Sequence, residues 1–286
     1  MMHSAANWFS DPQTLRQSAR TPLEGKTNKN YRLTVHGKDF HLKVRQHDGF
    51  PSFKKLQCVN ELLAAHGVPY TPIVETIPHH PNFPLGAVLF EWKEARKIVD
   101  LSEYEDLLPR VAGTLKAIHA IQVPYYENID LGLRTESYPE FITAVLRARL
   151  NQCKKDKLLD ASLEIPLTSF IGTITWGRDL SPVLVHRDAT KSNVLLQSDD
   201  TLLLIDWDNA EFTTPLADIA RIIFAYKWNL DDDKRDQILS TYLGTQASID
   251  EENILRVEYM RNALEGLIYK DTDRQYCHLV LEHLLQ

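Results

Sequence analysis

Three polar residues with the chemistry of a catalytic centre lie close together in the sequence. Asp188 follows the apolar run 183–185, and Asn193 comes five residues later. Asp206 directly follows the apolar run 202–205. An aspartate beside a hydroxyl can accept its proton, and Mg²⁺ prefers carboxylate and amide oxygens as ligands. These residues therefore predict phosphoryl transfer from a magnesium-bound nucleotide; the alternative is a hairpin whose acids are solvated turn residues.

The two apolar runs indicate how these residues are positioned. Both runs are short and bounded by polar residues, so they predict short buried strands over 183–185 and 202–205. The polar residues 197–200 predict a turn between them. Each predicted strand delivers one acid at its end.

These residues also carry a resemblance to a known family. The motif His-Arg-Asp-x-x-x-x-Asn at 186–193, followed by Ile-Asp-Trp-Asp at 205–208, resembles the catalytic and metal loops of the aminoglycoside phosphotransferase/choline kinase family, relatives of protein kinases. The resemblance implies that Asp188 is the catalytic base and that Asn193 and Asp206 bind Mg²⁺. It also implies an α+β, two-lobed protein-kinase-like fold, with a small antiparallel β-sheet and one helix in the N-lobe and a larger, mainly helical C-lobe.

Two further residues are implied to support the catalytic loop. Asp218, in Pro-Leu-Ala-Asp-Ile-Ala at 215–220, resembles the family aspartate that accepts backbone hydrogen bonds from that loop. His186 opens the catalytic motif and is expected to have a structural role. His119, within the predicted helix 101–121, is interpreted as a core histidine.

A polar loop before the first strands is the candidate nucleotide-binding segment. The wording Gly-x-Thr-Asn-x-Asn-Tyr at 25–31 is similar to the nucleotide loop of bacterial choline kinases, and a plain hairpin turn is the alternative. Alternating apolar residues over 31–35 and 40–44 predict two strands after it. The residues assigned to the phosphates of ATP or GTP are Gly25, Lys26, Thr27 and Asn28.

Lys43, in the second of these strands, is the candidate for the lysine that pairs with nucleotide phosphates, and Arg45 is its rival. Apolar residues at helical spacing predict a helix over 52–67 that ends at Gly67. Family members carry a glutamate on this helix that pairs with the strand lysine, and the only acidic residue here is Glu61. Either Glu61 pairs with Lys43 in a shifted register, or the ion pair is absent.

The run 85–92 reads as a buried strand that leads into a connector, and it resembles the hinge that holds adenine through backbone groups around Glu91. We place the lobe boundary after Trp92. Residues 1–92 then form the nucleotide-binding N-lobe, and residues 93–286 form the C-lobe with the catalytic loop, metal site and acceptor pocket. Further helices are predicted over 7–18, 101–121, 138–150, 162–178, 219–228 and 249–286.

Aromatic and acidic residues of the later part are candidates for binding the acceptor. Aromatic rings bind quaternary ammonium groups by cation–π attraction, and carboxylates bind ammonium groups by charge-assisted hydrogen bonds. Packing in the core is the alternative for most of them. The candidates are Trp207, Asp208, Tyr226, Trp228, Glu265 and Tyr269.

Both loops are nearest in wording to bacterial choline, ethanolamine and thiamine-type kinases, which implies an ATP- or GTP-dependent kinase for a small cationic alcohol. An aminoglycoside-type antibiotic phosphotransferase is the alternative within the same chemistry. A catalytically inactive nucleotide-binding module is the alternative of another class. A protein kinase is disfavoured, because no Asp-Phe-Gly stands at 206–208 and no Ala-Pro-Glu follows.

The composition fits an ordinary globular enzyme: of 286 residues, 43% are hydrophobic and 25% charged. The net charge of −7 is uneven, with 10 basic and 7 acidic residues up to position 92 and 22 against 32 beyond it. The basic first part suits a nucleotide and the acidic remainder suits a cationic acceptor; the alternative is that surface charge keeps the protein soluble. The sequence has no basic stripe of the kind that binds nucleic acid. The sequence shows no signal peptide and no apolar run of the ~20 residues that span a membrane. Three scattered cysteines indicate reduced thiols and a cytoplasmic location.

Overall fold

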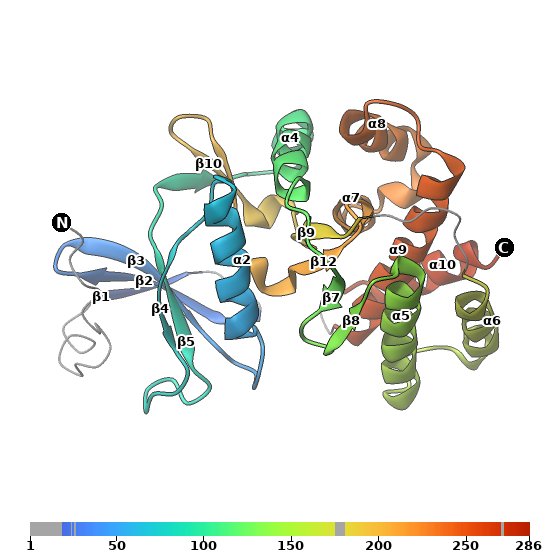
Figure 1. Cartoon of the computed structure of the whole chain (residues 1–286), viewed down its shortest axis with the longest axis horizontal. Helices are drawn as coiled ribbons and strands as arrows, with labels where there is room; N and C mark the ends of the chain where they lie inside the picture. Colours follow the sequence, from blue (N-terminus) through green and yellow to red (C-terminus); the bar gives the residue numbers. More distant parts are fainter. Residues whose placement is uncertain (1–18, 24, 26, 175–180, 270–271) are drawn as a thin grey trace. The chain divides into compact units, whose positions relative to one another are not determined.

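The computed structural model describes residues 19–23, 25, 27–174, 181–269 and 272–286. The chain divides into two compact units (Figure 1). Unit 1 comprises Met1–Ile98 and Val194–Asn209, and unit 2 comprises Val99–Asn193 and Ala210–Gln286. The predicted boundary after Trp92 differs from this division, because the later segment 194–209 joins the first unit through strand pairing.

The larger sheet of unit 1 is antiparallel, with strand order β1-β2-β3-β5-β4. The predicted alternation is observed in β2 and β3, where Leu33, Phe40 and Leu42 are buried in the core of the sheet. Gly37 adopts φ 74° in the turn between them, a conformation that glycine tolerates well. The strands are β1 (Ala19–Leu23), β2 (Lys29–Val35), β3 (Lys38–Val44), β4 (Ile73–Ile77) and β5 (Ala87–Glu91).

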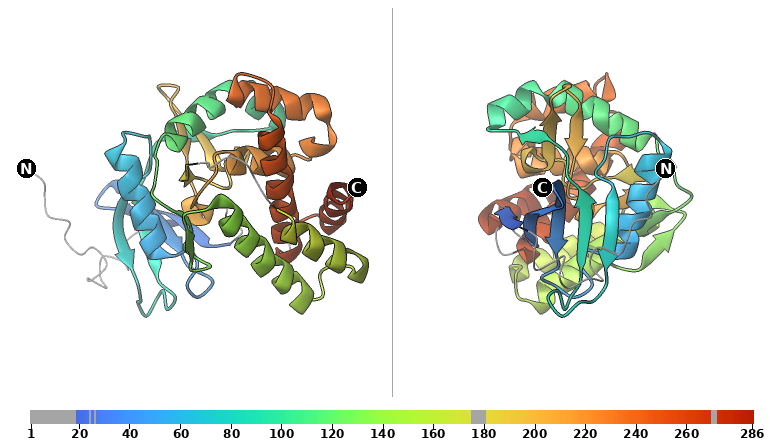
Figure 2. Two further views of the ribbon diagram at one scale, coloured as in Figure 1. Left: turned by 45° about the vertical axis from the view of Figure 1, so that its right-hand side comes forward. Right: turned by 90° about the vertical axis from the view of Figure 1, so that its left-hand side faces the viewer.

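Helix α2 (Phe53–Ala65) lies beside this sheet (Figures 1 and 2) and contacts β4. The Ser52 side chain caps its N-terminus by accepting a hydrogen bond from the backbone N–H of Lys55. Its buried face includes Leu56, Val59 and Leu63, at the spacing from which the sequence predicts a helix.

A second sheet of unit 1 joins segments that are far apart in the sequence. It has the order β11-β10-β6, with β6 (Ala95–Lys97), β10 (Val194–Gln197) and β11 (Leu202–Leu204). The predicted turn at 197–200 therefore connects β10 to β11. The other predicted strand, β9 (Val183–Val185), lies in a sheet of unit 2.

Unit 2 contains that sheet, of order β8-β7-β12-β9, and most of the helices. Helices α5, α7 and α10 all pack against α9, whose contact with α5 is visible in Figure 2. The remaining strands are β7 (Tyr126–Asn128), β8 (Leu133–Thr135) and β12 (Glu211–Thr213). The helices are α3 (Leu101–Asp106), α4 (Leu108–His119), α5 (Tyr138–Lys155), α6 (Ala161–Gly172), α7 (Leu216–Ala225), α8 (Asp232–Leu243), α9 (Ile249–Ile268) and α10 (Arg274–Leu284).

Several predicted helices differ from the structure in their limits, among them 138–150, which extends to Lys155 in α5. The segment 101–121 forms two helices, because a new helix, α4, begins at Leu108 with Pro109 in its first turn, where proline is tolerated. The segment 219–228 ends its helix at Ala225, where Lys227 adopts a left-handed φ of 61°. The tail 249–286 is divided into α9 and α10. The predicted helix 162–178 ends at Gly172, where α6 ends. Its predicted last residues, 175–178, and the predicted helix 7–18 lie outside the described residues.

None of the helices in the described part of the chain combines the length and apolar character that crossing a membrane requires.

Candidate active site

Asp188 and Asn193 contact each other in the loop that follows β9. Asn193 ends the short 3-10 helix η1 (Lys191–Asn193). Its Nδ2 donates to Asp188 Oδ2 at 2.8 Å and to the Asp188 backbone carbonyl at 2.9 Å. Its amide oxygen accepts no hydrogen bond from the residues that the structure describes. The Asp188 side chain remains 22% exposed.

The other Asp188 oxygen is bound by Arg221, a residue that sequence reasoning missed. Arg221 Nε and Nη2 donate to Asp188 Oδ1 at 3.2 and 3.0 Å. Arg221 lies on α7 three residues after Asp218, so the two side chains lie about one helical turn apart on one side of the helix. A cation one turn after the bracing aspartate was the signal that could have identified it.

Asp218 lies where the resemblance implies, beneath the catalytic loop. Its carboxylate accepts hydrogen bonds from the backbone N–H groups of His186 and Arg187. His119 Nε2 lies 3.0 Å from the same carboxylate, and Tyr242 lies 2.7 Å from the other ring nitrogen. Burial by itself would raise the pKa of Asp218, but the hydrogen bond and charge of His119 and the contacts of His186 lower it. His186 is fully buried and accepts from the Asp188 backbone N–H at 3.2 Å.

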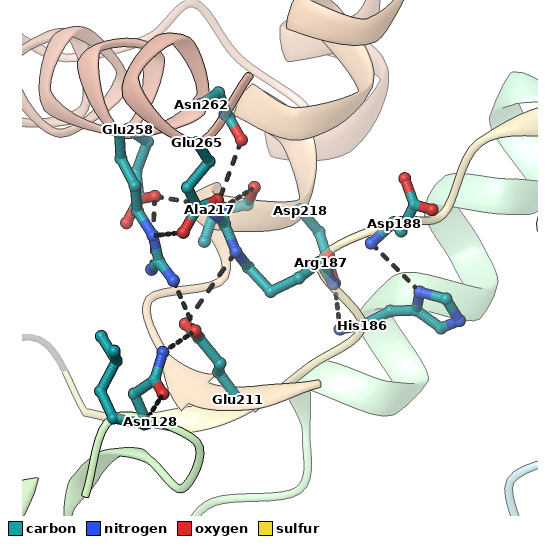
Figure 3. Close-up of polar contacts among 12 residues, drawn as sticks. Asn128, His186, Arg187, Asp188, Glu211, Ala217, Asp218, Glu258, Asn262 and Glu265 are labelled. Carbon is teal, nitrogen blue, oxygen red and sulfur yellow. Dashed lines mark hydrogen bonds and ion pairs between the residues drawn. The ribbon is translucent and has the colours of Figure 1, made fainter. Parts of the chain in front are cut away.

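Arg187 turns away from Asp188 into a buried cluster of charged residues (Figure 3). Its Nη1 donates to Glu258 at 3.2 Å and its Nη2 to Glu265 at 3.0 Å. Arg187 adopts φ 65°, a left-handed conformation that costs an L-residue about 1–2 kcal/mol. The buried ion pairs accordingly hold the residue before Asp188 in a strained conformation.

The same cluster includes Glu265, which the sequence predicted to contact the acceptor. Arg149, Arg187 and Arg261 all pair with its carboxylate. Burial would raise the pKa of Glu265, but these three cations lower it well below its ordinary value. Glu265 therefore has a structural role in this arrangement.

A second polar cluster lies within unit 1. Lys43 Nζ lies 2.6 Å from Asp206 Oδ1 and 2.8 Å from Asp208 Oδ1. Asn28 Nδ2 donates to Asp208 Oδ2 at 2.9 Å. Burial would lower the pKa of Lys43, but the two carboxylates raise it, so the lysine stays charged. Burial, together with the charge of Asp206, raises the pKa of Asp208, although Lys43 opposes this.

Asp208 and Trp207 were both predicted to contact the acceptor. In the structure, their side-chain polar atoms form hydrogen bonds within unit 1. Both Asp208 oxygens accept hydrogen bonds, from Lys43 and Asn28, and the side chain is buried. Trp207 is also buried, and its indole N–H donates to the Leu204 carbonyl at 3.1 Å. This geometry makes Asp208 a partner of the strand lysine.

Lys43 and Arg45, the two candidates for the phosphate-binding cation, lie in different surroundings. Lys43 lies against the two acids, whereas the Arg45 guanidinium lies 3.2 Å from the centre of the Phe53 ring. Glu61 is exposed on α2, while Lys43 takes its carboxylate partners from the segment after β11. The ion pair from the helix is thus replaced by pairs with Asp206 and Asp208.

The predicted nucleotide loop is held together by asparagines. Asn30 Nδ2 donates to the Asn28 carbonyl at 3.1 Å, and His41 Nε2 lies 2.9 Å from Asn30 Oδ1. A Cβ on Gly25 would lie 2.7 Å from the Asn28 carbonyl oxygen, so the loop requires glycine there. Asn28 Oδ1 is buried, and none of the residues that the structure describes donates a hydrogen bond to it. Three other residues were predicted to contact the nucleotide. Thr27 is exposed, and Lys26 lies outside the described residues. Glu91 ends β5, and its carboxylate lies 3.3 Å from Lys93 Nζ.

Tyr226 and Trp228 form an aromatic wall beside the catalytic loop. The Tyr226 ring centre lies 5.0 Å from that of Trp228 and 5.3 Å from that of Tyr104. The Tyr226 hydroxyl accepts from the Lys191 backbone N–H at 2.7 Å, and burial raises the pKa of Tyr226 to about 12. Trp228 is buried, with Lys234 Nζ 5.9 Å from its ring centre. Tyr226 is therefore more accessible to a ligand than Trp228.

The donor atoms fit a magnesium ion. The Asp206 side chain is 46% exposed, and Asn193 keeps its amide oxygen free of described partners. Each group by itself, the carboxylate in unit 1 and the amide in unit 2, offers the kind of oxygen atom that Mg²⁺ prefers. The described residues contain no group of three or more His, Cys, Asp or Glu side chains that could hold a metal, and a site completed by nucleotide phosphates does not require one.

The antiparallel sheet with its helix in unit 1, and the helical unit 2 that carries the Asp188 loop, define a protein-kinase-like fold. Residues 18–253 match the phosphotransferase enzyme family, and the chain belongs to this family. No curated protein matches the sequence.

Solved structures share the fold at low sequence identity. A thermostable mutant of aminoglycoside phosphotransferase APH(4)-Ia superposes with a TM-score of 0.69 at 16% identity over 96% of each chain. A complex of that enzyme with AMP-PNP and hygromycin B gives 0.68 at 17% identity over 93% of each chain. Plasmodium vivax ethanolamine kinase gives 0.65 at 14% identity, over 96% of this chain and 84% of that one.

Proposed function

We propose that this protein transfers the γ-phosphoryl group of ATP or GTP to a hydroxyl of a small molecule. The hydroxyl oxygen forms a bond to the γ-phosphorus while the bond from that phosphorus to the bridging oxygen breaks. The products are the phosphorylated acceptor and the nucleoside diphosphate, and the hydroxyl proton goes to Asp188. The observation that carries the proposal is the partly exposed Asp188 carboxylate, oriented by Asn193 and Arg221.

Residues of unit 1 support nucleotide binding. Lys43 is charged and held by two acids, which suits a cation that binds phosphate oxygens. Asn28, in the predicted nucleotide loop, donates to Asp208 and so contacts the same cluster. Solved relatives bind such ligands: APH(4)-Ia was crystallised with AMP-PNP and with ADP. We assign Asp206 and Asn193 to Mg²⁺, which would neutralise phosphate charge when bound.

The chemical identity of the acceptor is a separate part of the proposal. The resemblance supports a cationic, choline-, ethanolamine- or thiamine-like alcohol, and an aminoglycoside-type antibiotic is the second candidate. Hygromycin B occupies APH(4)-Ia, and ethanolamine is named for the Plasmodium enzyme. A catalytically inactive nucleotide-binding module is disfavoured by the presence of Asp188, Asn193, Asp206 and Lys43 together.

The test measures nucleotide turnover across amines, aminosugars and thiamine, with Asp188→Asn as the variant. We expect the variant to lower kcat by roughly 10²–10⁴-fold, the usual contribution of a positioned base, while nucleotide binding survives. Asp233→Asn, a change of the same type at an exposed position on α8, should leave turnover unchanged. Full turnover by Asp188→Asn would reject the assigned base.

A further inference from the structure

The catalytic loop of unit 2 contains a cation that proton transfer alone does not require. Arg221 binds Oδ1 of Asp188 through two guanidinium nitrogens, at 3.2 and 3.0 Å. Its side chain is 31% exposed. Arg221 lies in α7, one helical turn after Asp218. Most residues of this helix are buried, so the helix fixes the position of Arg221.

Arg221 retains unused hydrogen-bond donors. A guanidinium has five N–H groups, and within the described part of the chain the only hydrogen bonds of Arg221 are the two to Asp188. Arg187 and Arg261, by contrast, are buried among the carboxylates of Glu258 and Glu265. Arg221 therefore lies beside the proposed base and can still bind a further group.

The surroundings of Arg221 do not suit an ammonium group. Trp228 is buried, with Lys234 Nζ 5.9 Å from its ring centre. The carboxylate of Glu265 is already shared by three arginines. Tyr226 is half-buried there, and both neighbouring carboxylates, those of Asp188 and Glu265, already pair with arginines.

We propose that Arg221 binds an anionic group of the acceptor, a carboxylate or phosphate carried close to the hydroxyl that is phosphorylated. A hydroxyl that donates to Asp188 brings its neighbouring substituents against Arg221, since the two side chains are in direct contact. The planar guanidinium matches carboxylate and phosphate oxygens through paired hydrogen bonds. A bare ammonium alcohol would instead meet a like charge. This inference rests on the proposed phosphotransferase function and departs from the cationic acceptor that the sequence favours.

A competing role for Arg221 is to position Asp188 alone. In that case its loss would lower kcat equally for every acceptor. If Arg221 also binds the acceptor, its loss raises KM for acidic acceptors and leaves their uncharged or cationic counterparts much less affected.

The experiment uses the full chain with Mg²⁺ and ATP and compares matched acceptors. Ethanolamine is paired with serine, and glycerol is compared with glycerate and glycerol 3-phosphate, so that carboxylate and phosphate are tested separately. We expect at least one acidic member to exceed its counterpart about tenfold or more in kcat/KM. Arg221→Gln should lower that value by about 10–100-fold, mainly through KM, the range expected for a hydrogen bond to a charged group. Arg221→Lys should retain part of the preference.

Arg235→Gln is the matched control, because Arg235 is also partly exposed in unit 2 and pairs with Asp236. It should leave the acceptor preference unchanged. A wild-type preference for ethanolamine or glycerol, or an equal loss of kcat for all acceptors in Arg221→Gln, overturns the inference while phosphotransfer stands. If none of these acceptors is phosphorylated, and no amine, aminosugar or thiamine is phosphorylated either, the proposed function itself is rejected.

Discussion

The Asp208 carboxylate lies 2.8 Å from the Lys43 ammonium, and both side chains are buried within unit 1. A second Asp208 oxygen accepts from Asn28, a residue of the predicted nucleotide loop. Asp208 thus joins the strand lysine to that loop, a role that we assign to nucleotide binding.

Asp208→Asn tests this assignment. The amide removes the charge that faces Lys43, so we expect the KM for nucleotide to rise roughly 10–100-fold, as for loss of a hydrogen bond to a charged group. The KM for the acceptor should not change. Steady-state kinetics with each substrate varied in turn checks this, and a change confined to the acceptor KM would return Asp208 to the acceptor site.

Asp206→Asn tests the metal assignment. Loss of a directly bound carboxylate should weaken Mg·ATP binding by more than the roughly 10–100-fold typical of an outer partner, and binding without Mg²⁺ should change less. Calorimetry with and without Mg²⁺ measures both values. Asp199→Asn, in the exposed turn after β10, serves as control. Equal weakening with and without the metal would contradict the assignment.

Arg187→Met tests the buried cluster of unit 2. The change leaves the carboxylates of Glu258 and Glu265 with one cation fewer, so we expect a loss of roughly 3–5 kcal/mol in the free energy of unfolding. Urea unfolding measures it, with Arg235→Met as the partly exposed control. Combining Arg187→Met with Glu258→Gln should cost less than the sum of the two, because the residues are in contact.

Gly25→Ala tests the nucleotide loop. The added Cβ would clash with Asn30 Nδ2 and lie 2.7 Å from the Asn28 carbonyl oxygen, so the loop must shift. We expect the KM for nucleotide to rise about tenfold or more, the loss of one charged hydrogen bond, with little change in Tm. Gly113→Ala is the control, because a Cβ there meets no atom within 4 Å and alanine favours a helix.

The pH dependence of stability tests Asp218. Its pKa is lowered in the folded state, so its carboxylate stabilises the fold above the unfolded pKa of about 4 and that contribution is lost as pH falls further. Asp218→Asn should therefore destabilise the protein by roughly 3–5 kcal/mol near pH 7, and the difference from wild type should shrink below pH 4. Unfolding measured between pH 3 and 7, with Asp233→Asn as control, checks both. A difference that is independent of pH would contradict this account.

Local patterns in the sequence were sufficient for much of the fold. Apolar alternation over 31–35 and 40–44 identified β2 and β3, and helical spacing identified α2, because these signals depend on neighbouring residues. The lobe boundary was less accessible: the sequence assigned 194–209 to the second lobe, while β10 of this segment pairs with the distant β6. Strand pairing of this kind leaves no local trace.

For the site, the spacing of Asp188 and Asn193 within one loop was readable directly, since five residues can bring both side chains together. The family was readable for the same reason, because its motifs are short and continuous. The partners of these residues were not. Arg221 reaches Asp188 across 33 positions, and Lys43 reaches Asp208 across 165. Contacts over such separations depend on how helices and sheets pack, so tertiary structure alone showed that Arg221 contacts Asp188 and that Asp208 contacts Lys43.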